Sequence, residues 1–262
     1  MRKPNSLAEA VDALRTEHKR IVAQLHRDHE SVRSIASTAW RAQEAERQRL
    51  ARELHDGVGQ TLGALKNELS VLVRDELDAE AKQRADRALE LCASSIADIR
   101  ELSRLLFPPA LTDLGIRAAL EQLVRMVNDQ GALAVELIAD GDLHRLPLES
   151  ATFIYRICQE ALTNASRYAP GSNALIRIRV RDTDCSLLVM DDGPGFDTDA
   201  TAGRGFGLQA MRERASLFGA ALMIESAEGE GTRIRARLAV VKGDRGQGDR
   251  GQGTRRKMKD ER

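Results

Sequence analysis

The sequence predicts an all-helical region followed by an α+β domain, and three observations support this fold class. Apolar residues up to Leu106 recur every three or four positions, which is the period of an α-helix. After Gly131, short β-like runs are interleaved with two helical segments. Aromatic residues make up only 3% of the 262 residues, a composition that suits helical bundles built on Leu, Ala and Val.

The overall composition argues against several classes of protein. The 40 basic side chains balance the 40 acidic ones, so net charge gives no reason to expect direct binding to nucleic acid or to a membrane surface. Cys92, Cys158 and Cys185 form no CxxC pair and are expected to be buried thiols in a reducing compartment. No uncharged stretch is long enough to cross a membrane, and the first residues lack the apolar block of a signal peptide. We therefore expect a cytoplasmic protein with no membrane span in this chain.

Residues 1–45 are predicted to form a coiled coil or a long bundle helix. Apolar side chains step by four and three along this segment, with His18 and Asp28 as interruptions. The seam consists of Leu7, Val11, Leu14, Ile21, Leu25, Val32, Ile35, Ala39 and Ala42. His18, His26 and His29 suggest a metal site, but no two of them are four residues apart with a carboxylate partner. Solvated helix positions are therefore the better interpretation.

Residues 46–110 are predicted to form a helical hairpin. A second apolar stripe runs along a helix over 46–72, and a further helix covers 78–106. Because a single hairpin with one-sided stripes would leave apolar surface in water, we expect a homodimer that forms a four-helix bundle. Phe107-Pro108-Pro109 ends the hairpin, since proline removes a backbone donor and disfavours helix before it. A linker helix over 114–129 follows within residues 111–130.

Residues 131–241 are predicted to form the α+β domain, with helices packed against a mixed sheet. The predicted strands cover 132–139, 174–180, 186–191, 221–226 and 232–240, and the predicted helices cover 148–169 and 206–218. Residues 242–262 repeat Gly-Asp-Arg-Gly-Gln and end in a basic cluster. Their apolar content is too low for folding, so a disordered basic tail is expected.

His55 is the first candidate for chemistry. On a uniform 3.6-residue helix it lies at the edge of the apolar stripe, so its imidazole should be accessible. Neutral imidazole can attack phosphorus, and Asp56 could orient the ring or take its proton, although adjacent helical side chains diverge by about 100°. Three glycines in the same helix each cost about 0.8–1 kcal/mol relative to alanine, which suggests that something approaches closely. They are Gly57, Gly59 and Gly63. From this helix alone, a nucleophile and a solvated surface histidine remain open alternatives.

Three further motifs are compatible with a nucleotide site. Glu160, Asn164 and Arg167 fall on one helical face, where Asn and Glu suit Mg²⁺ and Arg suits phosphate. Asp191 ends a predicted strand and could accept from the exocyclic amine of adenine. Glycines that permit close approach of a phosphate follow it, and Thr232 follows a turn before the last strand. These glycines are Gly193, Gly195, Gly203, Gly205 and Gly207. Taken singly, each motif also fits a polar helix face or a loop-closing turn.

Taken in order, residues 46–240 resemble the histidine kinases that partner LuxR/NarL-type response regulators. The run from Glu53 through His55-Asp56 to Gln60 is similar to their H-D-x-x-x-Q phosphoacceptor box. The resemblance implies that His55 accepts the phosphoryl group, that Asp56 is the base, and that Gln60 positions water in a phosphatase reaction. It also implies a homodimer whose partner is the receiver domain of a response regulator.

The second half of the chain resembles the GHKL ATPases, which implies a GHKL (Bergerat) α/β sandwich that uses ATP and Mg²⁺. Asn164 matches the magnesium ligand of the N box and Glu160 its acidic position, whereas Arg167-Tyr168 replaces the frequent Lys-His. Asp191 matches the adenine-reading aspartate. The remaining matches are Gly193 and Gly195 of the D-x-G-x-G box, Gly203, Gly205, Gly207 and Leu208 around the glycine box of the ATP lid, and Thr232 near adenine.

Two other functions are compatible with parts of this pattern. One is another GHKL ATPase, such as a serine-directed anti-sigma kinase or an ATP-driven clamp, but these lack an H-D-x-x-x-Q helix before the ATP domain. The other is a degenerate kinase that acts as a dimeric scaffold or only as a phosphatase. The filled catalytic positions argue against it, although Tyr168 departs from the family pattern.

Overall fold

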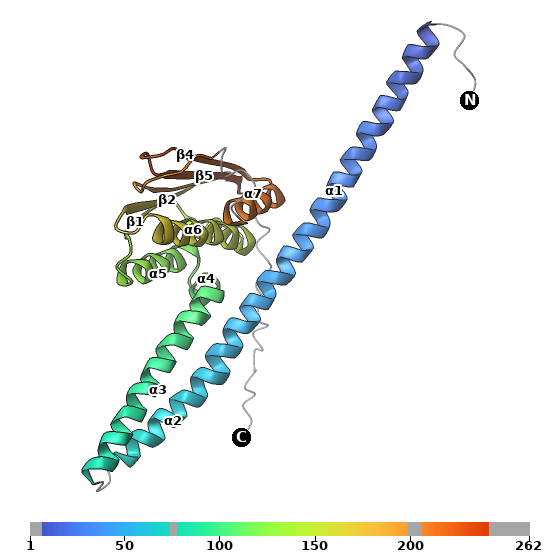
Figure 1. Ribbon diagram of the computed structural model, residues 1–262. Helices are drawn as coiled ribbons and strands as arrows, with labels where there is room; N and C mark the ends of the chain where they lie inside the picture. Colours follow the sequence, from blue (N-terminus) through green and yellow to red (C-terminus); the bar gives the residue numbers. More distant parts are fainter. Residues whose placement is uncertain (1–6, 74–77, 199–205, 241–262) are drawn as a thin grey trace, which may run out of the picture. The chain divides into compact units, whose positions relative to one another are not determined.

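The computed structural model describes residues 7–73, 78–198 and 206–240 (Figure 1). The chain divides into two compact units: Met1–Leu123 with Gly203–Gly219, and Val124–Ala202 with Ala220–Arg262. The predicted tail over 242–262 and two predicted site residues, Gly203 and Gly205, lie outside the described residues. None of the helices in the described ranges is long and apolar enough to span a membrane.

The first unit begins with the long helix α1, Leu7–Glu53, which confirms the prediction of a long helix (Figure 1). Its predicted apolar seam is exposed in the single chain. The exposed seam residues are Val11, Leu14, Ile21, Leu25, Val32 and Ile35. Near its C-terminal end, Trp40 and Ala51 are buried instead. Pairing of α1 into a coiled coil remains a prediction.

A π-helical turn interrupts the helix at His55. The elements here are α1, the π-turn Leu54–Val58 and α2, Gly59–Leu72. The expectation of a uniform 3.6-residue helix over 46–72 is therefore wrong at this turn, where the Gly59 amide donates to the carbonyl of Leu54, five residues earlier. Glycine weakens the α-helix at this point, and in the turn before it the Ser103 hydroxyl donates at 2.8 Å to the carbonyl of Ala51.

The predicted hairpin and its end are confirmed. Helix α3, Ala79–Leu106, packs against α2 and is capped by Asp78, whose side chain accepts from the Ala81 amide at 2.7 Å. Phe107 and Pro108 are buried where α3 ends. A short helix α4, Pro109–Asp113, precedes α5, Ile116–Asp129, and Gly115 separates them with a φ of 84°. The predicted linker helix thus exists, but α4 was not expected.

Helix α7, Phe206–Phe218, belongs to the same unit as α1. The rings of Trp40 and Phe218 meet edge to face, with centroids 4.8 Å apart. Arg33 donates from Nη2 to the carbonyl of Leu217 at 3.2 Å. These contacts leave the neighbouring seam residues Val32 and Ala39 exposed.

The second unit contains a five-stranded mixed sheet, as predicted. Its strands are β1 (Ala134–Asp140), β2 (Asn173–Arg181), β3 (Asp184–Asp191), β4 (Ala221–Ser226) and β5 (Thr232–Ala239). The strand order is β1-β2-β3-β5-β4, in which only β1 and β2 are parallel. A 3-10 turn, Leu143–Arg145, and helix α6, Leu148–Tyr168, connect β1 to β2.

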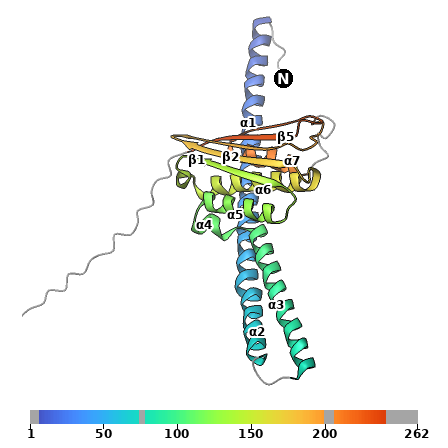
Figure 2. The same cartoon turned by 90° about the vertical axis from the view of Figure 1, so that its left-hand side faces the viewer.

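One face of the sheet is buried and the other is open. Figure 2 shows α6 along one side of the strands, and alternate strand residues on that side form the core. Ile176 and Ile178 of β2 have no exposed surface, whereas Arg177 and Arg179 between them are exposed. Because no described helix of this unit covers the second face, the unit is a two-layer α/β sandwich.

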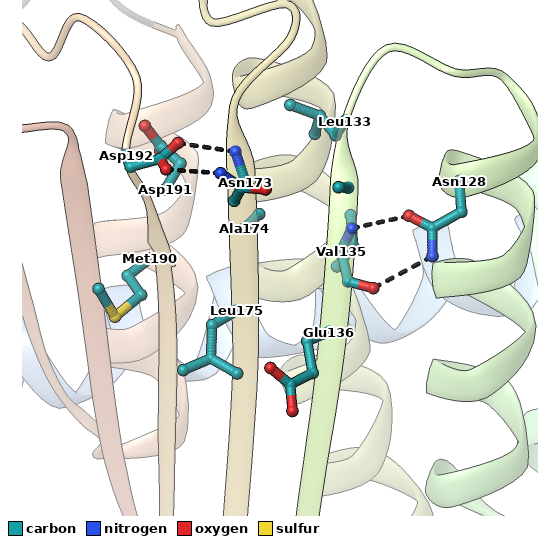
Figure 3. Close-up of a pocket in the computed structure, with 11 residues that line it drawn as sticks. Asn128, Leu133, Val135, Glu136, Asn173, Ala174, Leu175, Met190, Asp191 and Asp192 are labelled. Atoms are coloured by element: carbon teal, nitrogen blue, oxygen red, sulfur yellow. Dashed lines mark hydrogen bonds between the residues drawn. The ribbon is translucent and has the colours of Figure 1, made fainter.

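Asn128 of α5 closes part of the free edge of β1. The Val135 amide donates to Asn128 Oδ1 at 2.7 Å, and Asn128 Nδ2 donates to the Val135 carbonyl at 3.1 Å (Figure 3). The side-chain amide therefore replaces a neighbouring strand at this residue, which satisfies two edge groups that would otherwise be open to pairing.

The three cysteines are buried and unpaired, as the sequence predicts. Burial raises the pKa of the Cys158 thiol above its ordinary value and that of Cys185 to about 12. These thiols are therefore protonated at neutral pH and serve as small apolar residues in the core.

Candidate active site

His55 and Asp56 lie on the π-turn, and both side chains are exposed. Neither makes a hydrogen bond or ion pair with any residue in the described part of the chain. Gln60, in the first turn of α2, is also exposed. The imidazole is therefore open to a reactant that approaches from solvent.

The π-turn changes how these side chains are arranged. It holds more residues per turn than an α-helix, so the angle between His55 and Asp56 is smaller than the roughly 100° of α-helical neighbours. This weakens the geometric objection to Asp56 as a partner of the imidazole. The extra residue also rotates Gln60 back toward the side of His55, whereas an unbroken α-helix would place it on a different face.

Two buried residues of the hairpin are hydrogen-bonded to each other next to this turn. Ala51 is 3% exposed and Ser103 is 2% exposed, and the hydrogen bond between them joins α1 to α3 one turn before His55. Sequence reasoning missed Ser103, since a serine within a helix carries no signal of a partner about fifty residues away. Its position in contact with Ala51 depends on how the hairpin packs.

In the second unit, α6 brings two of its three predicted residues together. Asn164 Nδ2 donates to Glu160 Oε1 at 3.4 Å, and both side chains are partly buried. Asn164 Oδ1 accepts no hydrogen bond from a described residue, so a neutral oxygen remains available to a ligand. Arg167 does not join this pair. It is exposed, with its guanidinium 5.3 Å from the ring centroid of Tyr168.

Asp191 lies at the end of β3, on the side of the sheet that faces α6. Its Oδ1 accepts from the Gly193 amide at 3.0 Å. A Cβ on Gly193 would lie 2.3 Å from the Cβ of Ala169, just after α6, so only glycine fits here. Thr232 is directly opposite Asp191 in the pairing of β3 with β5. The end of α6, the aspartate and the threonine thus meet although they are remote in sequence.

Ser226 connects the loop after Asp191 to the turn before β5 through two hydrogen bonds. Its hydroxyl donates to the Gly231 carbonyl at 2.7 Å and accepts from the Phe196 amide at 2.9 Å. Gly195 of this loop has a φ of 62°, and a Cβ there would lie 2.0 Å from the Ala227 carbonyl oxygen. Sequence reasoning missed Ser226, because a serine at a strand end is too common to be a signal.

The hollow in Figure 3 lies on the open face of the sheet, away from α6. It has a volume of about 560 Å³, and Leu175 and Met190 form part of its wall. Asp192 Oδ1 accepts from the Asn173 backbone amide at 2.7 Å, and Oδ2 accepts from its side-chain amide at 2.8 Å. These hydrogen bonds, the side-chain one foremost, lower the pKa of Asp192. The two adjacent aspartates therefore differ: Asp192 joins strands, while Asp191 faces the helix side.

The glycine box of the predicted lid is only partly described. Gly203 and Gly205 lie outside the described residues, and Gly207 and Leu208 are half-buried in the first turn of α7. Their roles at a nucleotide remain predictions.

Two sequence models of protein families match the chain. The family described as "Histidine kinase" matches residues 46–111, which hold the helical hairpin and His55. The family described as "Histidine kinase-, DNA gyrase B-, and HSP90-like ATPase" matches residues 149–242, which hold α6, Asp191 and Thr232. The chain belongs to the histidine kinases. This membership confirms the family resemblance, and the first match disfavours the alternative of an ATPase without a phosphoacceptor helix.

Named relatives agree with this membership. The chain is 38% identical over 200 residues to "Sensor histidine kinase MctS" of Rhizobium johnstonii, which is 74% of this chain and 43% of the relative. It is 34% identical over 201 residues to "Sensor protein VraS" of Staphylococcus saprophyticus, which is 77% of this chain and 57% of the relative. This histidine kinase chain therefore spans about half the length of these curated relatives.

A solved structure of the same family aligns less closely. The histidine kinase domain of the Erythrobacter litoralis EL346 blue-light activated histidine kinase superposes with a TM-score of 0.44 at 20% identity. The alignment covers 69% of this chain and 94% of that one. Assignment of the sheet unit to the GHKL ATPase fold rests instead on its strand order and on the family match over 149–242.

Proposed function

We propose that this histidine kinase phosphorylates His55 with Mg-ATP and then transfers the phosphoryl group to an aspartate of a response regulator, of LuxR/NarL type by resemblance. One observation carries the proposal. An exposed His55 beside Asp56, on a π-turn within the histidine kinase match, is joined in one chain to an ATPase fold in which Asp191 and Thr232 are adjacent.

The second unit offers groups that fit the nucleotide. The Asp191 carboxylate can accept from the adenine amine, and the free Oδ1 of Asn164, with Glu160 beside it, suits Mg²⁺. No group of three or more His, Cys, Asp or Glu side chains gathers among the described residues, and Mg²⁺ typically takes few protein ligands together with phosphate oxygens and water. When bound, Mg²⁺ neutralises charge on the phosphates. Arg167 and the glycines of the lid are proposed to contact phosphate.

In the proposed step, a ring nitrogen of His55 attacks the γ-phosphorus of ATP. A nitrogen–phosphorus bond forms, the bond from phosphorus to the β,γ-bridging oxygen breaks, and ADP leaves with that oxygen. The ring loses the proton on its other nitrogen to Asp56, whose carboxylate lies one residue away on the π-turn. In the transfer to the regulator, His55 becomes the leaving group. An aspartate oxygen attacks phosphorus, and the bond from phosphorus to the His55 nitrogen breaks.

Gln60 is proposed to act when the enzyme works as a phosphatase. A neutral amide can orient a water molecule toward the acyl phosphate of the regulator, but it is not a strong base. Its exposure in the first turn of α2, close to His55 along the helix, suits a group that meets the regulator there.

The kinase is proposed to act as a homodimer through residues 46–106. In the single chain, apolar side chains of the π-turn and α2 such as Val58, Leu65 and Leu72 are about half exposed, and a second hairpin would cover them. In this proposal residues 1–45 carry the signal, 46–110 form the dimeric hairpin, 111–130 link it to the ATP domain over 131–241, and 242–262 form the tail.

Labelling with γ-³²P-ATP tests the proposal. The full chain should gain label that is stable to alkali and labile to acid, as expected for phosphohistidine, and His55→Gln should abolish it while nucleotide binding persists. His18→Gln, which changes an exposed histidine on α1, is the matched control and should label normally. Persistent label in His55→Gln, or none in the parent chain with bound ATP, would refute the assignment.

A further inference from the structure

The open face of the sheet carries an unusual number of arginines. Because side chains alternate along a strand, the exposed residues of β2 and β5 all point to this face. The arginines are Arg177, Arg179, Arg181, Arg233, Arg235 and Arg237. The carboxylates on the same face are fewer, namely Glu136, Asp140, Asp184 and Glu225. The face is therefore basic although the whole chain is neutral.

The strand register places four of these arginines around β3. Leu188 of β3 is opposite Arg177 on one side and Arg235 on the other. Two residues away, Ser186 is opposite Arg179 and Arg237. Since neighbouring strands lie about 4.8 Å apart, the two columns of arginine Cα atoms are roughly 10 Å apart, with steps of about 6.6 Å along each strand. We call this feature the arginine groove; it has a volume of about 320 Å³.

Intramolecular ion pairs leave much of this positive charge available. Arg179 pairs with Asp140 at 2.9 Å, Arg237 pairs with Asp184 at 3.0 Å, and Arg235 pairs with Glu225. The guanidinium groups of all three pairs are exposed, so solvent screens each pair and it can exchange partners at little cost.

Arg177 is the exception within the groove. It makes no ion pair or hydrogen bond with any residue that the structure describes, although it lines the arginine groove. An anionic partner would therefore meet one unneutralised guanidinium and three that are weakly held.

The floor of the groove is apolar. Leu188 is half-buried between the arginine columns, and Ala221 and Met223 of β4 continue the floor beyond β5. Met223 is 56% exposed, a large fraction for a methionine in a sheet. A ligand for this surface must combine negative charge with at least one apolar group, because charge alone would leave the floor in water.

We propose that the arginine groove is a docking surface for an acidic segment of a partner protein that carries an apolar anchor residue. The anchor covers Leu188 and Met223, and carboxylates on either side of it pair with Arg177, Arg179 and Arg237. Protein is favoured over nucleic acid for two reasons. The apolar floor at Leu188 and Met223 suits an apolar side chain and offers nothing to a phosphate backbone, and none of the outward residues on the described strands is an aromatic on which a base could stack.

Fluorescence anisotropy on the full chain tests this surface with a labelled peptide in which glutamate alternates with leucine. We expect saturable binding with a Kd below about 1 mM that weakens as salt screens the exposed charges. Arg177→Glu should weaken binding about tenfold or more, because an attraction becomes a repulsion while no existing ion pair is lost. Met223→Gln should also weaken it. Arg125→Glu, the same change on an exposed residue of α5, is the matched control and should bind like the parent.

Several outcomes would overturn the proposal. They are absence of saturable binding, equal weakening by Arg125→Glu and Arg177→Glu, equal binding of a peptide with serine in place of leucine, and tighter binding of a single-stranded oligonucleotide or of anionic vesicles. Unchanged thermal unfolding and unchanged His55 labelling in the variants would show that the fold and the proposed kinase site are intact, because the groove contributes no residue to that site.

Discussion

Replacing Ser103 by alanine should disturb the turn that carries His55. The Ser103 hydroxyl is buried and donates at 2.8 Å to the Ala51 carbonyl. A typical hydrogen bond of this kind contributes about 1 kcal/mol net, and leaving a buried acceptor without its donor costs about 1–3 kcal/mol. Alanine recovers up to roughly 0.5 kcal/mol through its higher helix propensity. We therefore expect Ser103→Ala to destabilise the hairpin by about 1–2 kcal/mol.

Hydrogen exchange can locate this loss. Amides of the π-turn Leu54–Val58 should exchange about five- to thirtyfold faster in Ser103→Ala, the ratio that 1–2 kcal/mol corresponds to. Ser94→Ala is the matched control, since Ser94 is an exposed residue of the same helix and gains the same propensity. If both variants protect the π-turn equally, the Ser103 bond does not hold it. Phosphorylation of His55 should fall in Ser103→Ala and recover in Ser103→Thr, which keeps the hydroxyl.

Three further predictions concern the second unit. Asn164→Ala and Asp191→Ala should each lose Mg-ATP binding while the helical hairpin stays folded, and calorimetry that finds parent-like binding in either variant would contradict their roles. Gly193→Ala should destabilise the end of α6, because its Cβ would lie 2.3 Å from that of Ala169; a parent-like unfolding midpoint would show that the loop can move aside. Asn173→Ala should raise the pKa of Asp192 toward the ordinary value of about 3.9, followed by NMR titration of the carboxyl group. Since that pKa is lowered in the folded protein, the contribution of Asp192 to stability is present above pH 4 or so and is lost as pH falls through the folded-state pKa. Asn173→Ala should reduce this acid dependence without removing it, because the backbone amide of residue 173 still donates to Asp192.

Periodicity predicted most of the architecture. The alternation of β2 and the long apolar stripes of the hairpin each follow from burial on one side, so the elements were found to within a few residues. The π-turn could not be predicted, because a helix-wide apolar stripe gives no sign of one extra residue in a turn. The contact beside it, from Ser103 to Ala51, comes from another helix and is equally absent from the local sequence.

The candidate site was predicted as residue types more than as an arrangement. Motif spacing identified Asp191 and Thr232, but their adjacency depends on β5 lying between β3 and β4, which no local pattern encodes. The pairing of Asn173 with Asp192 was missed for the same reason, since it needs the register of β2 against β3. Spacing likewise suggested that Arg167 shares a site with Asn164, whereas its side chain lies against Tyr168.

One strand register serves both faces of the sheet. The alignment of β3 with β5 that sets Asp191 opposite Thr232 on the helix side also sets Ser186 opposite Arg237 on the open side. A slip of one residue would exchange the two faces and destroy both arrangements at once, so the buried core that fixes the pairing of Asp191 with Thr232 also fixes the arginine groove. Leu188 lies three residues before Asp191 on the same strand. A partner bound at the groove would therefore contact the same strand that ends at Asp191, the residue proposed to bind adenine, which gives the open face a physical route to the proposed kinase site.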